Sequence, residues 1–266
     1  MRSLRLDAAL PERGLAMSRE RAKQMILAGE VFVNGAVIKK PARMIAEDDR
    51  IEARHSGKVD YVGRGYLKLE KAIESFYINV SGLNCLDIGA STGGFTQLLL
   101  ERGASKVTAV DVGTGQLAPL LREDSRVTNL EKTDIRTVTR EMVGKADFAC
   151  VDVSFISLNL IFPHMFALLS EAGSAVCLLK PQFEAGPQRI GKRGVVKDKK
   201  VQAQVLSEVL WHAKEVGFSV CGVTHSPIRG GEGNLEFLVY LHKNRMDENQ
   251  LNFEEIVQTA WRELVG

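Results

Sequence analysis

The sequence predicts a doubly wound α/β domain, in which a mostly parallel, seven-stranded sheet is covered by helices on both faces, preceded by a small α+β domain. From Leu67 onward, strand-like runs of nearly continuous apolar character alternate with helix-like segments. This alternation is typical of parallel strands that are buried on both faces. The length of 266 residues, 45% of them apolar, suits one large domain, or a domain of ordinary size with a small companion.

Two helices followed by a small β unit are predicted for residues 1–60. An apolar stripe of leucines forms the first helix, and the second begins at Ser18 and ends at Gly29. The Asn34-Gly35 dipeptide that follows favours a type I′ hairpin turn between two short strands.

The rest of the chain alternates between strands and helices. Residues 55–64 lack an amphipathic period and predict a linker. Strands are then predicted at residues 83–88, 107–112, 127–130, 146–153, 175–179, 218–224 and 236–241. Helices are predicted at residues 67–76, 94–102, 160–169 and 200–216. The last two strands, joined by a glycine-rich turn, are candidates for an antiparallel pair. We expect three parts, at residues 1–60, 61–243 and 244–266, the last an acidic helical tail.

Composition and spacing exclude several classes of protein. A membrane span needs about 20 consecutive apolar residues, whereas the longest apolar stretches, 146–153 and 175–179, are short. Asp7 lies where a secretory signal needs its apolar region, so we expect a cytoplasmic protein with no membrane partner. No metal site is predicted, because the histidines lack paired spacing and the cysteines are far apart. Buried thiols are therefore expected at Cys85, Cys150, Cys177 and Cys221.

The net charge of +2 hides an uneven distribution. Residues 1–60 carry 12 basic and 9 acidic side chains, and residues 180–200 carry seven basic and two acidic ones. The tail, residues 244–266, carries two basic and five acidic side chains. A basic N-terminal module and a basic loop are thus combined with an acidic end, which leaves nucleic acid open as a partner.

The N-terminal pattern resembles the RNA-binding domain named after ribosomal small-subunit protein four. The resemblance rests on the strings Arg5-Leu6-Asp7, Ser18-Arg19 and Val31-x-Val33-Asn34-Gly35. In that family a helical pair presents basic side chains to RNA phosphates. The resemblance implies RNA contacts from Arg5, Arg13, Arg19, Arg21 and Lys23. The alternative interpretation is a solvated helix face that is basic by chance.

Residues 185–200 combine glycines with basic side chains. We predict a substrate loop that orders on RNA through Arg189, Lys192 and Arg193. A plain flexible loop remains the alternative.

A glycine-rich loop follows the first strand of the α/β domain, at Asp87-Ile88-Gly89-Ala90-Ser91-Thr92-Gly93-Gly94-Phe95-Thr96. Such a loop lets a ligand approach the backbone at the carboxyl edge of a sheet, but its spacing is not the G-x-G-x-x-G of dinucleotide enzymes. Asp111 ends the second strand, where a carboxylate can accept hydrogen bonds from ribose hydroxyls. Asp134 follows the third strand and is placed to meet an adenine edge.

Together these features are typical of methyltransferases that use S-adenosylmethionine, whose positive sulfonium and amino groups favour nearby carboxylates. We therefore predict S-adenosylmethionine as the cofactor. A tight turn alone is the alternative explanation of the glycines. The predicted cofactor contacts are Asp87, Gly89, Ala90, Ser91, Thr92, Gly93, Gly94, Phe95, Asp111 and Asp134.

Four charged residues stand at predicted element ends, where burial would be costly unless they have a function. They are Lys68, Asp152, Lys180 and Glu236. Strand ends of a parallel sheet converge on one crevice, so these side chains should meet. Methylating a hydroxyl requires a group that removes or stabilises its proton, and a lysine can do this only when burial or a second cation lowers its pKa. Lys180 flanked by Lys68 meets that condition, with the two acids orienting the lysines. Taken singly, each residue could be a surface lysine or a helix-capping carboxylate.

The set Lys, Asp, Lys, Glu is similar to the tetrad of ribose 2′-O-methyltransferases of the FtsJ/RrmJ type. Together with Asp152-Val153-Ser154-Phe155-Ile156-Ser157-Leu158 and Lys180-Pro181-Gln182-Phe183-Glu184, it resembles the TlyA family, often called haemolysins. The resemblance runs over nearly the whole chain. It implies a Rossmann-like fold, 2′-O-methylation of cytidine in ribosomal RNA, and ribosomal subunits as partners, with a monomer favoured.

Two other functions stay open at this point. One is an RNA-binding ribosome assembly factor whose methyltransferase fold is inactive. The other is a membrane-active haemolysin, for which the sequence offers neither a span nor a strongly amphipathic cationic helix.

Overall fold

The computed structural model describes every residue except 1–3, 17–18, 47, 54–60, 192–193 and 245–250. The described chain forms two compact units, Met1–Val62 and Gly63–Gly266. Each unit has its own apolar core. The three parts predicted from the sequence remain a prediction.

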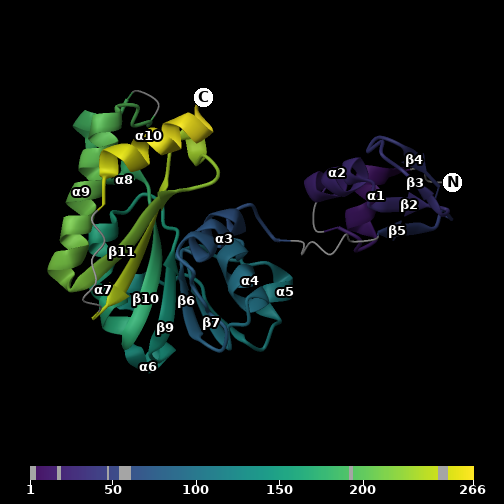
Figure 1. Ribbon diagram of the computed structural model, residues 1–266. Helices are drawn as coiled ribbons and strands as arrows, with labels where there is room; N and C mark the ends of the chain where they lie inside the picture. The colour runs from purple at the N-terminus through teal and green to yellow at the C-terminus, as the bar shows by residue number, and fades with distance from the viewer. Residues whose placement is uncertain (1–3, 17–18, 47, 54–60, 192–193, 245–250) are drawn as a thin grey trace. The chain divides into compact units, whose positions relative to one another are not determined.

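Helices pack against short antiparallel strands in the N-terminal unit (Figure 1). Helices α1 (Leu6–Glu12) and α2 (Arg19–Ala28) contact each other through buried apolar side chains such as Leu10 and Met25. Strand β2 (Val31–Val33) pairs with β3 (Ala36–Val37) and β5 (Ile51–Ala53), and β1 (Leu4–Arg5) pairs with β4 (Met44–Ile45).

The predicted hairpin turn at Asn34-Gly35 is confirmed. The φ angles of the two residues are 52° and 82°, and a type I′ turn needs positive φ at both central positions. The pair β1–β4 was not predicted, because two-residue strands carry no period that a sequence could reveal.

Seven strands in the described part of the second unit form one sheet, in the order β11-β12-β10-β9-β6-β7-β8. The strands from β10 to β8 run parallel, whereas β12 runs antiparallel to both of its neighbours. The predicted mostly parallel sheet and the antiparallel pairing of the last two strands are therefore confirmed. The strand bounds are β6 (Asn84–Ile88), β7 (Lys106–Val110), β8 (Val127–Leu130), β9 (Ala146–Val151), β10 (Leu169–Leu179), β11 (Phe218–His225) and β12 (Phe237–Lys243).

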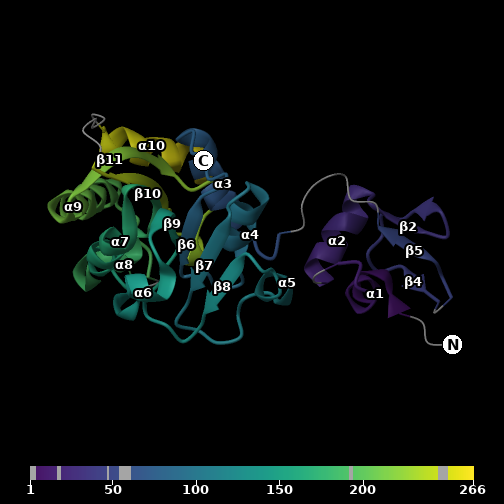
Figure 2. The same ribbon diagram turned by 90° about the horizontal axis from the view of Figure 1, so that it is seen from below.

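Helices cover both faces of this sheet, with α3 and α4 on one side and α7 and α9 on the other (Figures 1 and 2). Helix α10 contacts α9 and β11 and buries Val257 and Ala260. Among the described residues, none of the helices combines the length and apolar character that a membrane span requires. The helix bounds are α3 (Tyr66–Ser75), α4 (Gly94–Glu101), α5 (Pro119–Arg122), α6 (Arg140–Val143), α7 (Phe162–Leu168), α8 (Pro181–Glu184), α9 (Lys199–Val216) and α10 (Phe253–Leu264).

The fifth strand differs most from its predicted bounds. It begins at Leu169 rather than Ala175, and the preceding helix is correspondingly shorter. The pairing with β9 shifts register between Leu169 and Ser174, so the strand passes through an irregular stretch before its continuous apolar run begins. The four-residue helices α5, α6 and α8 were not predicted, because a single turn shows no amphipathic period.

Candidate active site

The four predicted catalytic residues lie at one edge of the sheet. Asp152 follows β9 and Lys180 follows β10, and these parallel strands end at the same edge. Glu236 precedes β12, and because β12 is antiparallel to β10, its start lies at that edge too. Lys68 comes from the first turn of α3.

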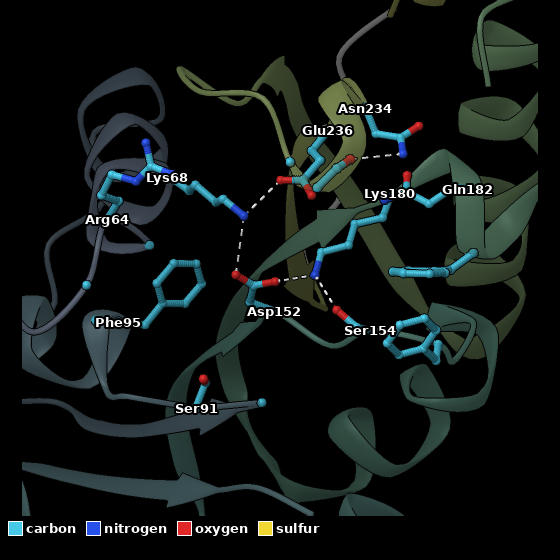
Figure 3. Close-up of a pocket in the computed structure, with 18 of the residues that line it drawn as sticks. Arg64, Lys68, Ser91, Phe95, Asp152, Ser154, Lys180, Gln182, Asn234 and Glu236 are labelled. Atoms are coloured by element: carbon cyan, nitrogen blue, oxygen red, sulfur yellow. Dashed lines mark hydrogen bonds and ion pairs between the residues drawn. The ribbon is translucent and has the colours of Figure 1, made fainter. Parts of the chain in front are cut away.

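These side chains form a continuous series of ion pairs (Figure 3). Lys68 Nζ lies 2.8 Å from Glu236 Oε2 and 3.5 Å from Asp152 Oδ2. Lys180 Nζ lies 2.6 Å from Asp152 Oδ1 and donates a hydrogen bond to Ser154 Oγ at 3.0 Å. The structure thus brings together the residues that the sequence predicts as catalytic, with Asp152 shared between the two lysines.

The charge of Lys68 is held by its acidic partners. Burial lowers the pKa of Lys68, but the carboxylates of Asp152 and Glu236 outweigh burial and raise that pKa above its ordinary value. Lys68 therefore stays a cation at neutral pH. The side chains of Lys68, Lys180 and Glu236 are only 11%, 9% and 3% exposed, so the cluster is shielded from solvent.

Lys180 retains a donor for a substrate. A lysine ammonium has three N–H donors. Within the described part of the chain, Asp152 and Ser154 engage two of the donors of Lys180. Lys180 also lines a cavity of about 610 Å³, so the third position on Nζ can face a group bound there, as an N–H in the ammonium or as a lone pair in the neutral amine.

Two cavities lined by described residues meet at this cluster. The first, of about 610 Å³, is lined mainly by Gly63, Arg64, Gly65, Lys68, Thr92, Phe95, Lys180, Gln182, Phe183, Asn234 and Glu236 (Figure 3). The second, of about 430 Å³, is lined mainly by Ile88, Val110, Asp111, Val112, Gln116, Thr133, Asp134, Ile135, Val153 and Ile156. Both are lined by Gly89, Ser91, Asp152, Ser154 and Phe155, so a bound molecule can extend from one into the other.

The glycine loop forms the shared wall of the two cavities. A Cβ at Gly89, which has φ +83°, would lie 2.5 Å from the backbone oxygen of Asp152, so only glycine fits this approach of two strand ends. Asp111 accepts hydrogen bonds from the backbone N–H of Ser91 at 2.8 Å and of Gly113 at 2.7 Å. Its carboxylate is thereby fixed at the mouth of the second cavity.

Comparison with known proteins shows which family the chain resembles. Residues 61–243 match the model of the FtsJ-like methyltransferases, and residues 4–51 match that of the S4 domain. The chain is 46% identical over 260 residues to the Bacillus subtilis protein named "Putative rRNA methyltransferase YqxC", an alignment that covers 96% of this chain and 92% of that protein. It is 43% identical over 241 residues to the 16S/23S rRNA (cytidine-2′-O)-methyltransferase TlyA of Mycobacterium tuberculosis, which covers 90% of each chain.

The chain belongs to the TlyA family of FtsJ-like methyltransferases. A solved structure described as "Putative hemolysin from Streptococcus thermophilus" superposes with a TM-score of 0.74 at 42% identity, covering 99% of this chain and 97% of that one. The predicted Rossmann-like methyltransferase fold and the S4 domain are thereby confirmed.

The residues around the second cavity fit S-adenosylmethionine, the cofactor of this methyltransferase family. Asp111 directly follows β7, and two backbone N–H groups hold its carboxylate in place. A carboxylate at this position can accept hydrogen bonds from the two hydroxyls of a ribose. Apolar side chains of Ile88, Val110 and Ile135 line the same cavity and can contact a planar base. Asp152 and Gly89 lie where this cavity meets the first, on the side that would receive the charged end of the cofactor.

Asp87 differs from the prediction. Its carboxyl is fully buried, accepts a hydrogen bond from Thr96 Oγ1 at 2.7 Å, and is not among the described residues that line either cavity. Burial raises the pKa of Asp87 to about 6. In this structure Asp87 holds the glycine loop onto the first turn of α4, beneath the cavities rather than in them.

Gly93 also acts through the backbone. It precedes α4 with φ 98°, and a Cβ there would collide with the side chains of Leu117 and Leu121. It lines neither cavity as described. Gly93 therefore allows the tight turn before α4, and the cofactor contact predicted for it from the sequence stays a prediction.

Asp134 lines the second cavity but is already paired. Arg136 Nη2 lies 2.6 Å from Asp134 Oδ2, and the Asp134 carboxylate also accepts the backbone N–H of Arg136. The side-chain hydrogen bond from Arg136 is the largest cause that lowers the pKa of Asp134. A contact of this carboxylate with an adenine edge would therefore be made with Arg136 attached.

The basic side chains of the N-terminal unit are partly engaged within it. Arg5 and Arg19 lie 2.8 Å and 3.4 Å from the buried carboxylate of Asp7, yet their side chains stay 45% and 55% exposed. Arg13 donates hydrogen bonds to the carbonyl oxygens of Asp49 and Ala46. Asp7 thus forms ion pairs with two of the arginines predicted to contact RNA, Arg5 and Arg19, while about half of each arginine side chain stays accessible to solvent.

The other predicted RNA contacts are partly buried, held by an ion pair, or outside the described residues. Lys23 lies in α2 and is partly buried. Arg189 is held by Glu208, with 3.0 Å between Arg189 Nη2 and Glu208 Oε2. The side chain of Arg21 and the residues Lys192 and Arg193 lie outside the described part of the chain.

Several cavity residues were not predicted. Ser154 and Phe155 directly follow the strand-end acid Asp152, and that position is the signal that could have found them. Gln182 lies in the string Lys180-Pro181-Gln182-Phe183-Glu184, which supports the family resemblance but assigns Gln182 no role, and Asn234 belongs to no recognisable pattern in the sequence.

Proposed function

We propose that this chain transfers a methyl group from S-adenosylmethionine to the ribose 2′-hydroxyl of a cytidine in ribosomal RNA. The observation that carries the proposal is the shielded series of ion pairs from Lys180 through Asp152 to Lys68, at the junction of the two cavities. The name of the Mycobacterium tuberculosis relative, a 16S/23S rRNA (cytidine-2′-O)-methyltransferase, supports the same substrate class.

The chemistry requires a partner for the hydroxyl proton. A ribose hydroxyl is a weak acid, so its proton must leave as the new O–C bond forms. When bound, S-adenosylmethionine supplies the methyl group on a sulfonium, which becomes a neutral thioether as the C–S bond breaks. We assign Lys180, in its neutral amine form, to receive the proton on the lone pair of Nζ, which then becomes an ammonium. Its position is fixed by Asp152 and Ser154, which aligns it before the substrate arrives.

Lys68 and Glu236 have a supporting role in this proposal. Lys68 compensates the charge of Asp152 and is itself held by Glu236, which keeps the shared carboxylate in place. Removing one partner of such a shielded set leaves an uncompensated charge, so the set should fail as a unit.

Phe155 is suited to receive the nucleobase. It is 90% exposed and lines both cavities. Exposed aromatic side chains commonly stack on unpaired bases of RNA. The S4 domain supports a separate RNA contact, and the basic side chains of residues 4–51 are proposed to bind phosphates there.

Methyl transfer to isolated ribosomal subunits tests this function. Subunits from cells that lack the gene are incubated with the purified protein and labelled S-adenosylmethionine, and 2′-O-methyl positions are then mapped on the RNA. Lys180→Ala should reduce the rate by about 10²–10⁴-fold, the usual contribution of a general base. The matched control is Lys106→Ala, at the exposed start of β7, away from the cavities. Full transfer by K180A with unchanged RNA binding would show that the assignment of the base is wrong.

The same experiment separates the alternatives. Binding of subunits without any transfer would favour an assembly factor with an inactive methyltransferase fold. Lysis of red cells by the purified protein that survives Lys180→Ala would favour a haemolysin. We further propose that the enzyme acts as a monomer, which sedimentation of the purified protein measures.

A further inference from the structure

Phe155 is held in a backbone conformation that its side chain does not favour. Its φ is 64°, in the left-handed region, which is a genuine outlier for a bulky residue. Such a conformation is unfavourable for a side chain with a Cβ and persists only where the surroundings enforce it. Something must therefore hold the turn from Asp152 to Leu158, which carries Phe155 between the two cavities.

A carboxylate from another segment binds the end of this turn. Glu184 Oε2 accepts a hydrogen bond from Ser157 Oγ at 2.6 Å, and Glu184 Oε1 accepts one from the backbone N–H of Leu158 at 2.9 Å. Burial raises the pKa of Glu184, and these two hydrogen bonds oppose that effect. Glu184 ends α8, four residues after Lys180, and it is not among the described residues that line either cavity.

The two segments also meet nearer to the cavities. Lys180 Nζ donates to Ser154 Oγ at 3.0 Å, and the rings of Phe155 and Phe183 lie 5.0 Å apart. The contacts follow in register, because residues 180, 183 and 184 face residues 154, 155 and 157–158. The hydrogen bonds of Glu184 form the outermost of these contacts.

We infer that Glu184 is a positioning residue, whose carboxylate holds the Phe155 turn so that Ser154 and Lys180 keep their alignment for methyl transfer. The inference rests on the proposed function. Glu184 touches neither cavity, so it acts on the reaction only through the turn that it binds. Misplacement of a reacting group by about 1 Å can cost 10²-fold in rate.

The test compares three variants with the wild type in the methyl transfer assay. Glu184→Ala removes both hydrogen bonds, Ser157→Ala removes one, and Glu184→Gln keeps an oxygen that can accept one. Sites able to bind cofactor are counted by calorimetric titration with S-adenosylhomocysteine, and kcat is expressed per such site. Glu215→Ala, an exposed position on α9, is the matched control.

We expect kcat per site to fall about 10–100-fold in E184A and less in S157A, while E184Q stays within about threefold of the wild type. The affinity for S-adenosylhomocysteine and the behaviour of E215A should not change. Hydrogen exchange of residues 153–158 should be faster in E184A.

The inference is overturned if E184A keeps kcat per site within twofold of the wild type, which would leave Glu184 a purely structural role. Should E184A fail to fold, S157A and E184Q decide: an unchanged kcat in S157A overturns the inference, and a reduced one with E184Q near wild type supports it. A wild-type protein that transfers no methyl group overturns the proposed function, and the inference with it. Active wild type with equally active E184A overturns the inference alone.

Discussion

Asp87 links the stability of the fold to pH. Its carboxyl is fully buried against Thr96, and burial raises its pKa from 3.8 to about 6. The native state therefore binds the proton more tightly than the unfolded chain. The stability that this group contributes is fully present below about pH 4 and is lost as pH rises through 6. A shift of this size corresponds to about 3 kcal/mol.

Asp87→Asn should remove this dependence. The amide oxygen can still accept the hydrogen bond from Thr96 Oγ1, but the side chain no longer titrates. Between pH 4 and pH 7, the wild type should lose about 2 kcal/mol of unfolding free energy relative to D87N. Urea unfolding of both proteins across this range measures the difference. Parallel pH profiles would contradict the expectation.

For single residues, the sequence predicts which charged residues stand at the ends of elements, but it does not predict where their side chains point. Lys68, Asp152, Lys180 and Glu236 were assigned because burying a charge at a predicted element end is costly without a function, and the structure brings them together. Asp87 has the same kind of position in the sequence. Its side chain points into the core instead, where it contacts Thr96 of α4.

Among the elements, the loops around the cavity are tied by a buried asparagine. Asn234 Nδ2 donates to the carbonyl oxygen of Gly194 at 3.0 Å, and Asn234 Oδ1 accepts the backbone N–H of Val196 at 3.3 Å. Gln202 Nε2 donates to Val196 O at 2.7 Å. The basic loop predicted to order on RNA is therefore anchored at its C-terminal end before any RNA binds.

Asn234→Ala should loosen that anchor. It leaves the backbone N–H of the buried Val196 unpaired, at a cost of about 1–3 kcal/mol, and frees the carbonyl of the exposed Gly194 to solvent. We expect the KM for ribosomal subunits to rise severalfold, while the affinity for S-adenosylhomocysteine is retained. Hydrogen exchange of residues 194–196 should be faster, and Asn79→Ala, in an exposed turn, is the control. If hydrogen exchange of residues 194–196 and the KM for subunits are both unchanged, Asn234 does not hold this loop in place.

Helices and strands could be predicted from the sequence where apolar residues form a sustained run or period. The buried parallel strands were predicted because each is a continuous apolar run, and the long helix α9 because its period is sustained. A two-residue strand such as β4 and a one-turn helix such as α5 have no repeat to detect. The early start of β10 was missed because its first residues are irregular.

For the molecule as a whole, charge is concentrated where RNA is proposed to bind. Residues 1–60 carry 12 basic and 9 acidic side chains. Binding to ribosomal subunits should therefore weaken steeply as salt concentration rises. Arg19→Gln removes a side chain that is 55% exposed, and it should reduce the slope of log K against log salt by about one.

Filter binding or sedimentation at several salt concentrations measures that slope. Lys106→Gln, at the opposite edge of the sheet from the cavities, should leave it unchanged. A flat salt response of the wild type would rule out phosphate contacts as the main source of affinity.

The place of β12 in the sheet determines when the enzyme can first work. Among the strands of the described residues, β12 is the last along the chain, yet it lies between β10 and β11. During synthesis, β11 has no partner in the sheet until residues 237–243 have emerged, and Lys68 lacks Glu236 until the same moment. Domains generally fold as units while they leave the ribosome. A growing chain therefore carries its S4 domain long before it has an active site, and no methylation can begin until residues 236–243 have left the ribosome.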